Sequence, residues 1–273
     1  MRQGGRQVPV GKVQVNTGFI VAGLLVGFIV GMTGVGGGSL MTPILLYFGI
    51  NPATAVGTDL LYAAITKGSS VWVHNKHRNI DWRVTGWLAV GSVPAAIVTL
   101  VLLHVCGADT KAINALIKST LGVALLLTAA AILLKPVMQR LMGRAAVVSA
   151  ESMRSRRTVA ATVFTGVVLG VIVTLSSIGA GALGTVALFA LYPLLPTSRL
   201  VGTEIAHAVP LTLVAGLGHA GLGNLDLHIL GFLLMGSLPG IYVGSHLAGR
   251  LPDRFLRPAL AVMLAIVGTK LVF

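Results

Sequence analysis

The stretch "GMTGVGGGSLMTP", residues 31–43, places five glycines and a proline in an apolar run that extends from residue 18 to residue 48. As one helix this run would be roughly 45 Å long, whereas the hydrocarbon core of a bilayer is about 30 Å thick. Glycine and proline interrupt helices, and a bilayer tolerates an interrupted helix only where protein or a water-filled cavity satisfies the freed backbone groups. We therefore predict two half-helices, 18–33 and 38–49, that meet inside the membrane.

The composition indicates an integral membrane protein. Of the 273 residues, 55% are hydrophobic and only 10% are charged, and the mean hydropathy is +0.91, so the polar surface is too small for a soluble globule. The alternating ten-residue segments of a membrane β-barrel do not appear. We predict an all-α, multi-pass protein of the cell (inner) membrane. Its apolar segments are 18–48, 53–73, 84–105, 113–134, 160–192, 200–222, 228–248 and 256–273.

The net charge of +13 comes mostly from Lys and Arg in the short loops between apolar segments. This pattern sets the orientation of a membrane protein, so we predict that the chain interacts with the lipid bilayer and with a small anionic substrate, and that it does not bind nucleic acid. Cys106 is the single cysteine, which excludes an intramolecular disulfide and a cysteine metal cluster. We predict neither a metal site nor a cofactor.

The chain contains an internal repeat. A shift of 145 residues superposes "AVGTDLLYAAITKGSSVWVHNKHRNID" (55–81) on "LVGTEIAHAVPLTLVAGLGHAGLGNLD" (200–226). Upstream, a shift of 143 residues superposes "GFIVGMTGVGGGSL" (27–40) on "GVIVTLSSIGAGAL" (170–183). The glycine-rich interruption therefore occurs once in each half of the chain.

The repeat defines the domain organisation. We predict two homologous halves of four segments each, a first transmembrane repeat at 18–135 and a second at 159–273, which form one transport domain. The basic stretch 136–158 is predicted to be a cytoplasmic linker. Paired halves with interrupted apolar segments in corresponding places are typical of secondary transporters, and the interruptions indicate the binding site.

The two interruptions have the chemistry of an anion site. Glycine allows turns and leaves no side chain over the backbone, so the N–H groups that open the second half-helix can face a ligand. "SSIGAGALGT", residues 176–185, adds two serine hydroxyls in the second half. The alternative is that these small residues only allow close packing of helices.

"GMTGVGGGSLMTPILLYFGINPATAVGTDL", together with its weaker second copy, resembles the sulfite exporter TauE/SafE family of membrane proteins. The resemblance covers nearly the whole chain. It implies a transporter of sulfite, organosulfonates or related sulfur-containing or carboxylate anions, which bind near the two breaks. The sequence departs from the family pattern at Asp59 and Glu204, where the pattern has a small or uncharged polar residue after Gly-Thr.

Charged groups also lie within the apolar segments, where an ionised side chain costs roughly 2.5–3.5 kcal/mol. We predict that Asp59 and Glu204, with His207 one helical turn from Glu204, couple transport to protons, and that Lys67 binds the anion. The alternatives are that the acids cap helices and that Lys67 reaches to the membrane surface. The predicted substrate-binding residues are Thr33, Gly36, Gly37, Gly38, Ser39, Thr58, Lys67, Ser176, Ser177, Gly179, Gly181 and Thr203.

Other function classes fit the sequence less well. An intramembrane enzyme would need a nucleophile, a base and an orienting group, and no such set is recognisable, so we predict no enzymatic activity. An anion channel or uniporter without a coupling ion would use the same breaks and is the alternative function. A purely structural membrane protein would tolerate loss of the glycine clusters.

The distribution of Lys and Arg in the loops is compatible with two membrane topologies. Both long segments can cross the membrane, which makes the halves parallel, or both can be re-entrant hairpins, which makes the halves inverted. The distribution of Lys and Arg is equally asymmetric in the two cases. We favour inverted repeats, because a long segment with a central glycine break suits a hairpin and inversion brings both breaks to the midplane.

Overall fold

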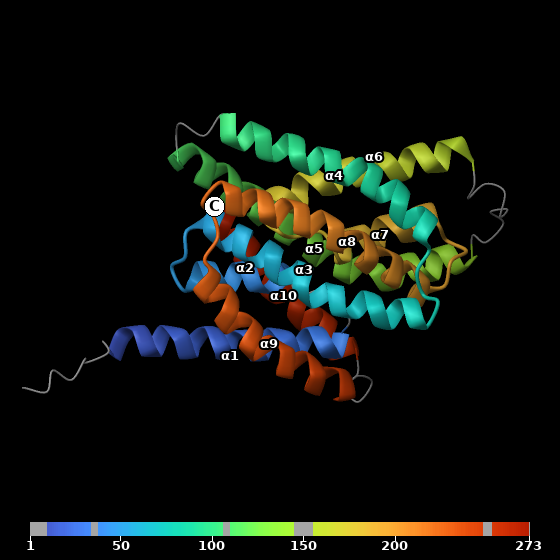
Figure 1. Cartoon of the computed structure of the whole chain (residues 1–273). Coiled ribbons are helices and arrows are strands. Elements are labelled where there is room, and N and C mark those ends of the chain that lie inside the picture. The colour runs from blue at the N-terminus through green and yellow to red at the C-terminus, as the bar shows by residue number, and fades with distance from the viewer. Residues whose placement is uncertain (1–9, 34–37, 106–109, 145–154, 248–252, 273) are drawn as a thin grey trace, which may run out of the picture.

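The structure is a computed structural model that describes residues 10–33, 38–105, 110–144, 155–247 and 253–272. No strand occurs in these ranges, and the prediction of an all-helical chain is confirmed for them (Figure 1). The described residues form α1 (Val10–Thr33), α2 (Gly38–Tyr47), α3 (Pro52–Lys76), α4 (Trp82–Val105), α5 (Thr110–Arg144), α6 (Arg156–Ser176), α7 (Ala182–Leu191), α8 (Thr197–Gly221), α9 (Leu227–Leu247) and α10 (Asp253–Val272).

The described residues of each half form five helices, because the first apolar segment of each half corresponds to two of them, α1 with α2 and α6 with α7. Within the predicted linker, α5 continues to Arg144 and α6 begins at Arg156. Residues 145–154 and Cys106 lie outside the described ranges.

Helices of the first half pack in pairs with helices of the second half. α1 of the first half packs along α9 of the second, and α4 packs along α6 in the same way, so that these pairs form opposite edges of the bundle (Figure 1). α3 and α8 pack against each other between the edges, and α5 packs against α10. Each of these four pairs therefore joins one helix from each half.

Glycines bring the edge helices into backbone contact. A Cβ atom on Gly236 of α9 would lie 1.9 Å from the carbonyl oxygen of Ile20 on α1. At the opposite edge, a Cβ atom on Gly91 of α4 would lie 2.1 Å from the carbonyl oxygen of Val163 on α6. These glycines serve close helix packing, which is the usual role of small residues in membrane helices.

The central helices α3 and α8 run in opposite directions. Gly57, near the start of α3, lies against the carbonyl oxygen of Asn224, which follows α8. Gly202, near the start of α8, lies against the carbonyl oxygen of Asn79, which follows α3. Equivalent helices of the two halves are thus antiparallel at the centre of the bundle.

The first two helices form a hairpin. The Phe48 ring, just after α2, lies 5.1 Å from the Phe19 ring near the start of the apolar part of α1, with an edge-on geometry. An ideal Cβ atom on Gly18 would lie 3.1 Å from the Phe48 ring. The chain therefore turns back after α1, and α2 runs antiparallel to it.

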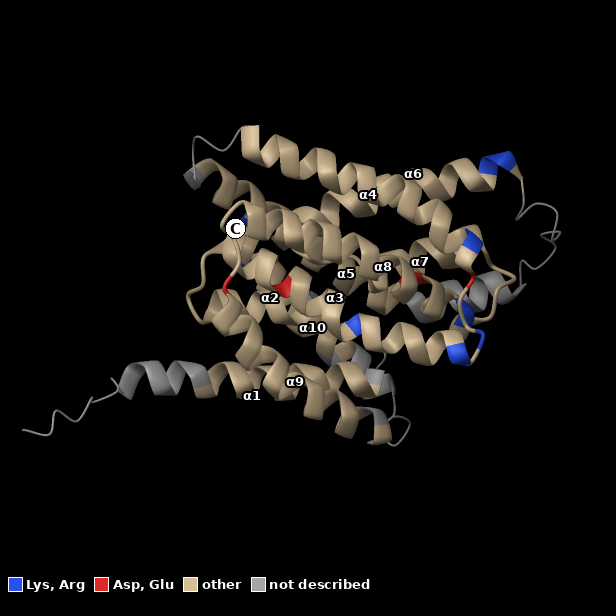
Figure 2. Ribbon diagram, in the orientation of Figure 1, with Lys and Arg blue, Asp and Glu red and all other residues tan. Residues whose placement is uncertain are grey.

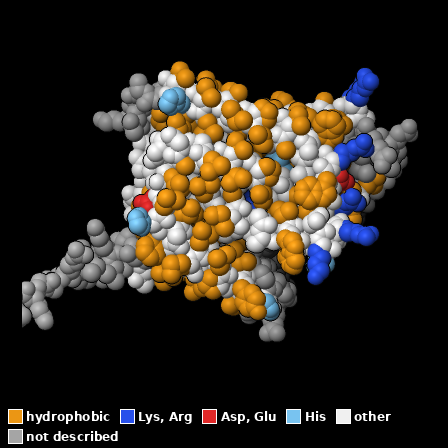
Figure 3. All heavy atoms as spheres, in the orientation of Figure 1, with side chains coloured by type: hydrophobic (Ala, Val, Ile, Leu, Met, Phe, Trp, Pro, Cys, Tyr) orange, Lys and Arg blue, Asp and Glu red, His pale blue; other side chains and the backbone are white. Residues whose placement is uncertain are grey.

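Several helices have the length and composition of membrane spans. Five qualify within the described ranges, namely Trp82–Val105, Ala112–Leu134, Arg156–Ser176, Thr197–Gly221 and Leu227–Gly244, with shorter apolar helices at Thr17–Met32, Ala182–Leu191 and Leu260–Val272. Figure 3 shows hydrophobic side chains spread over the middle of the visible face. An apolar exterior of this kind suits a bilayer, and the prediction of a multi-pass membrane protein is confirmed.

Basic side chains gather at one end of the bundle (Figure 2). Arg199, at the start of α8, forms an ion pair with Asp81 in the loop before α4, with 3.4 Å between the nitrogen and oxygen atoms. The starts of α4, α6 and α8 and the end of α3 lie at this end of the molecule.

Candidate functional site

Polar side chains are buried around the central helices α3 and α8, inside an otherwise apolar bundle. A buried charge is expensive unless it is paired or hydrogen-bonded, so these groups are expected to have a function or specific partners. The members of this central polar cluster are Thr42, Asp59, Tyr62, Lys67, Ser92, Ser177, Glu204, His207 and Ser237.

Asp59 is completely buried on α3. The hydroxyl group of Thr42 on α2 donates a hydrogen bond to its carboxylate, and Ser177, from the second half, lies beside it. Asp59 does not begin a helix, because the N-cap of α3 is Asn51, whose side chain accepts a hydrogen bond of 2.9 Å from the backbone N–H of Ala53. The carboxylate therefore lies at the junction between the first hairpin and the second half.

Lys67 lies two turns further along α3 and is only 5% exposed. Its ammonium group donates a hydrogen bond to the backbone carbonyl of Ala180, in the segment between α6 and α7. It interacts electrostatically with both Glu204 and Asp59. The ammonium group thus points into the protein, at the second predicted break.

Glu204 occupies the position on α8 that Asp59 occupies on α3, and it is 1% exposed. Its side chain lies against Gly184 of α7, where an added Cβ atom would be 3.0 Å from the carboxylate oxygen Oε1. Gly184 leaves the space in which this carboxylate lies. In each half, an acidic side chain is therefore buried between the central helix, α3 or α8, and the short helix before it, α2 or α7.

His207 lies one turn after Glu204 on α8 and contacts the edge helix α4. Its Nε2 atom lies 2.8 Å from the hydroxyl of Ser92 on α4, and both side chains are fully buried. The equivalent positions are Tyr62 on α3 and Ser237 on α9, whose side chains also interact. The role of His207 beside Glu204 stays a prediction.

The segment between α6 and α7 departs from helical geometry. α6 ends at Ser176, Ser177 has a φ of 58° and Gly179 has a φ of 115°, a conformation that favours glycine. The Ser176 hydroxyl donates to the carbonyl of Ile172 over 2.6 Å. The Ser177 hydroxyl is 3% exposed and has no hydrogen bond of normal geometry. This buried hydroxyl faces the Asp59 carboxylate from the segment that precedes α7.

For the first break, the structure describes only the flanking residues. Thr33 is the last residue of α1, whereas Gly38 and Ser39 open α2. Gly36 and Gly37 lie outside the described residues.

Two predicted binding residues hold loops in the structure. The Thr203 hydroxyl accepts a hydrogen bond of 2.8 Å from the backbone N–H of Asp81. The Thr58 hydroxyl accepts an equivalent bond of 3.2 Å from the backbone N–H of Asp226. Each threonine thus connects a central helix to the loop that leaves the other central helix.

The sequence prediction did not include four members of the central polar cluster, Thr42, Tyr62, Ser92 and Ser237. A signal existed for the two serines, which occupy the same place in the repeated Gly-Ser-x-Pro pattern of 91–94 and 236–239. Thr42 and Tyr62 carried no such signal, because threonine and tyrosine are common in membrane helices. Within the described ranges, no group of three or more His, Cys, Asp or Glu side chains could hold a metal ion.

Comparison with known proteins gives a family match and curated relatives. Residues 19–271 match the family model described as "Sulfite exporter TauE/SafE". The chain is 39% identical over 259 residues to the "Probable membrane transporter protein YjnA" of Bacillus subtilis (strain 168), an alignment that covers 94% of this chain and 100% of that relative. It is 29% identical over 263 residues to the "Probable membrane transporter protein YdhB" of the same organism, with 93% and 99% coverage. No solved structure matches the chain.

Proposed function

Because this chain belongs to the sulfite exporter TauE/SafE family of membrane transporters, we propose that it is a proton-coupled secondary transporter of small anions. The substrate class is sulfite, an organosulfonate or a related sulfur-containing or carboxylate anion, and the site of action is the cell (inner) membrane. The anion binds near the midplane, between the two glycine-rich breaks.

The observation that carries this proposal is the position of Lys67. Its ammonium group is buried at the segment between α6 and α7, and it interacts with Asp59, beside which the Ser177 hydroxyl of the same segment lies. The N-terminus of α7 adds the positive end of a helix dipole at the same segment. A cation, a hydroxyl and a helix N-terminus are the groups that recognise a small oxyanion in a site with little water.

Proton coupling follows from the two acids. An anion that enters beside Lys67 also approaches Asp59 and Glu204, and like charges repel strongly where water is excluded. Protons on the carboxylates remove that repulsion, so anion and proton bind together. Asp59 and Glu204 are then the coupling groups, and His207, one turn after Glu204, assists it and is fixed by its hydrogen bond with Ser92 of α4.

Purified protein in proteoliposomes tests both parts of this function. We expect saturable uptake of a small anion, identified by a screen of sulfite, sulfonates and carboxylates, and a rate that rises with an imposed proton gradient. We expect Asp59→Asn and Glu204→Gln to retain anion binding but to lose most of the dependence of transport on the gradient. Asp226→Asn is the matched control, because Asp226 caps α9 through its carboxylate, and asparagine caps equally well.

A wild-type response to the gradient in both neutralised variants would contradict proton coupling. Saturable flux without any response to the gradient would favour the alternative, an anion channel or uniporter that uses the same site.

We also propose that the two repeats are inserted in opposite orientations. The antiparallel packing of α3 and α8 supports this arrangement. The end of the bundle at which α3 ends and α4, α6 and α8 begin, with Lys76, Arg83, Arg156 and Arg199 at these helix termini, is then cytoplasmic, because basic residues are retained on that side.

Cysteine labelling at equivalent positions tests the orientation. In a background without Cys106, we expect a membrane-impermeant thiol reagent to reach Gly221→Cys from outside and Lys76→Cys only after the cells are opened. The two positions are equivalent in the repeat, both are exposed, and a side chain at Gly221 meets no atom within 4 Å. Labelling of both cysteines from the same side would establish parallel repeats.

A further inference from the structure

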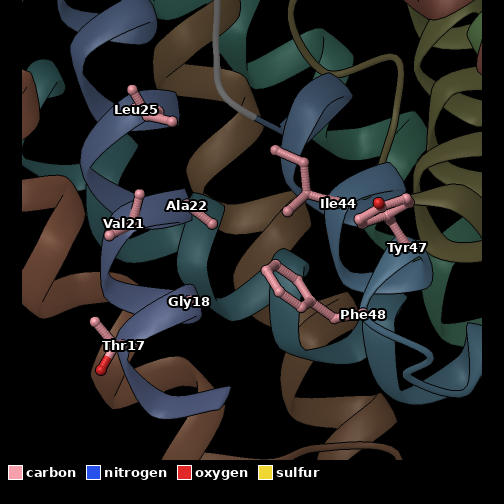
Figure 4. Close-up of a pocket in the computed structure, with 8 residues that line it drawn as sticks. All are labelled: Thr17, Gly18, Val21, Ala22, Leu25, Ile44, Tyr47 and Phe48. Atoms are coloured by element: carbon pink, nitrogen blue, oxygen red, sulfur yellow. The ribbon is translucent and has the colours of Figure 1, made fainter. Parts of the chain in front are cut away.

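An apolar groove of about 620 Å³ opens between the two arms of the first hairpin (Figure 4). Val21, Ala22 and Leu25 of α1 form one wall, and Ile44 and Tyr47 of α2, with Phe48 just after it, form the other. Tyr47 is 90% exposed and Leu25 is 57% exposed, so the groove lies open on the surface. It is separate from the central polar cluster.

The hairpin helices of the two halves differ in their packing partners. In the second half, α5 packs against both α6 and α7, the helices that are equivalent to α1 and α2. In the first half, α10 is the equivalent of α5 and contacts α2, yet the groove remains open beside α1.

The groove lies in the apolar part of the hairpin, since α1 is continuously apolar over Thr17–Met32. No charged residue lines it. The medium that surrounds such a surface in a bilayer is hydrocarbon, and an unfilled gap would lose dispersion contacts on both walls. We propose that the groove holds one acyl chain of a membrane phospholipid.

The shape of the groove favours an acyl chain over a helix of a second copy. Phe48 reaches across to α1, where its ring meets Phe19 at 5.1 Å and lies 3.1 Å from the ideal Cβ position of Gly18, so the walls join at this end. A helix with side chains is about 10–12 Å wide. A single file of methylene groups enters such a narrowing groove, whereas a helix does not.

A phospholipid with a photoactivatable diazirine in the middle of one acyl chain tests the proposal. After reconstitution, irradiation and digestion, we expect labelling of Val21, Leu25, Ile44 and Tyr47 to exceed severalfold that of equally exposed residues on α4. Val21→Trp with Leu25→Trp fills the groove and should remove most of the labelling at Ile44 and Tyr47. The control, Val98→Trp with Val101→Trp, alters two α4 side chains of similar exposure and should leave this labelling unchanged.

Native mass spectrometry supplies a readout that does not depend on labelling. We expect the detergent-purified protein and the α4 control to retain one phospholipid per chain and the groove-filling variant to retain none. Even labelling over all exposed apolar residues, or equal lipid retention by all three proteins, would overturn the proposal. Dimers cross-linked through Leu25 or Tyr47 would assign the groove to a second copy. None of these results depends on transport activity.

Discussion

Lys67→Gln is expected to weaken anion binding by about thirtyfold or more, because truncation of one partner of a buried charge pair typically costs about 2–5 kcal/mol. Lys67 is a cation buried at the segment that begins α7, and glutamine keeps much of its length without its charge. Titration of purified protein with the anion selected in the binding screen measures the dissociation constant. Lys76→Gln is the matched control, because Lys76 is an exposed lysine at the end of the same helix.

Loss of Lys67 also leaves Asp59 and Glu204 without their buried counter-charge, so the single variant is expected to be less stable. Lys67→Gln combined with Asp59→Asn separates the two effects. We expect the double variant to recover part of the thermal stability, since Glu204 remains without its counter-charge, but not the anion affinity. Wild-type affinity in either variant would show that Lys67 has only a structural role.

Gly236→Ala is expected to destabilise the protein strongly, although it adds a single methyl group. The new Cβ atom would lie 1.9 Å from the carbonyl oxygen of Ile20 and 2.8 Å from the backbone nitrogen of Leu24, so α1 and α9 must move apart. Overpacking of this kind costs roughly 1–3 kcal/mol, and rigid backbone atoms on both sides place this case at the upper end. Thermal unfolding in detergent, followed by the loss of monodisperse protein, measures the effect.

Gly231→Ala provides the control on the same helix, because a Cβ atom there meets nothing within 4 Å. We expect its unfolding temperature to equal or slightly exceed that of the wild type, since alanine favours helix over glycine. Gly91→Ala, at the opposite edge, should resemble Gly236→Ala, with a Cβ atom 2.1 Å from the Val163 carbonyl oxygen. Equal unfolding temperatures for Gly231→Ala and Gly236→Ala would contradict the close packing of the edge helices.

Much of the candidate site could be predicted from its chemistry. Asp59, Lys67, Glu204 and His207 are conspicuous because ionisable groups are rare in apolar segments, and the structure buries all four around α3 and α8. Their partners could not be predicted. Lys67 contacts Ala180, which lies 113 residues away, and a backbone carbonyl leaves no mark in the sequence.

The role of the glycines could not be assigned from the sequence alone. Gly236 and Gly91 occupy equivalent positions of the two halves, as the glycines of the two breaks do, yet they serve helix contacts. Similarly, Thr58 and Thr203 follow the repeated Gly, as a binding residue could, and their hydroxyls hold the loops at Asp226 and Asp81. A small residue permits close approach, but the neighbour that approaches is decided by the tertiary structure.

The sequence by itself determined the class of protein, its all-helical character, the internal similarity between its two halves and the membership of a transporter family. These properties depend on composition, on the length of apolar runs and on similarity along the chain, all of which are local or additive. Only the tertiary structure decided that α1 packs on α9 and α4 on α6, and that α3 and α8 run antiparallel with the charged groups between them. The physical reason is that helices in a membrane are apolar on nearly every face, so their sequence pattern does not indicate which face meets which partner.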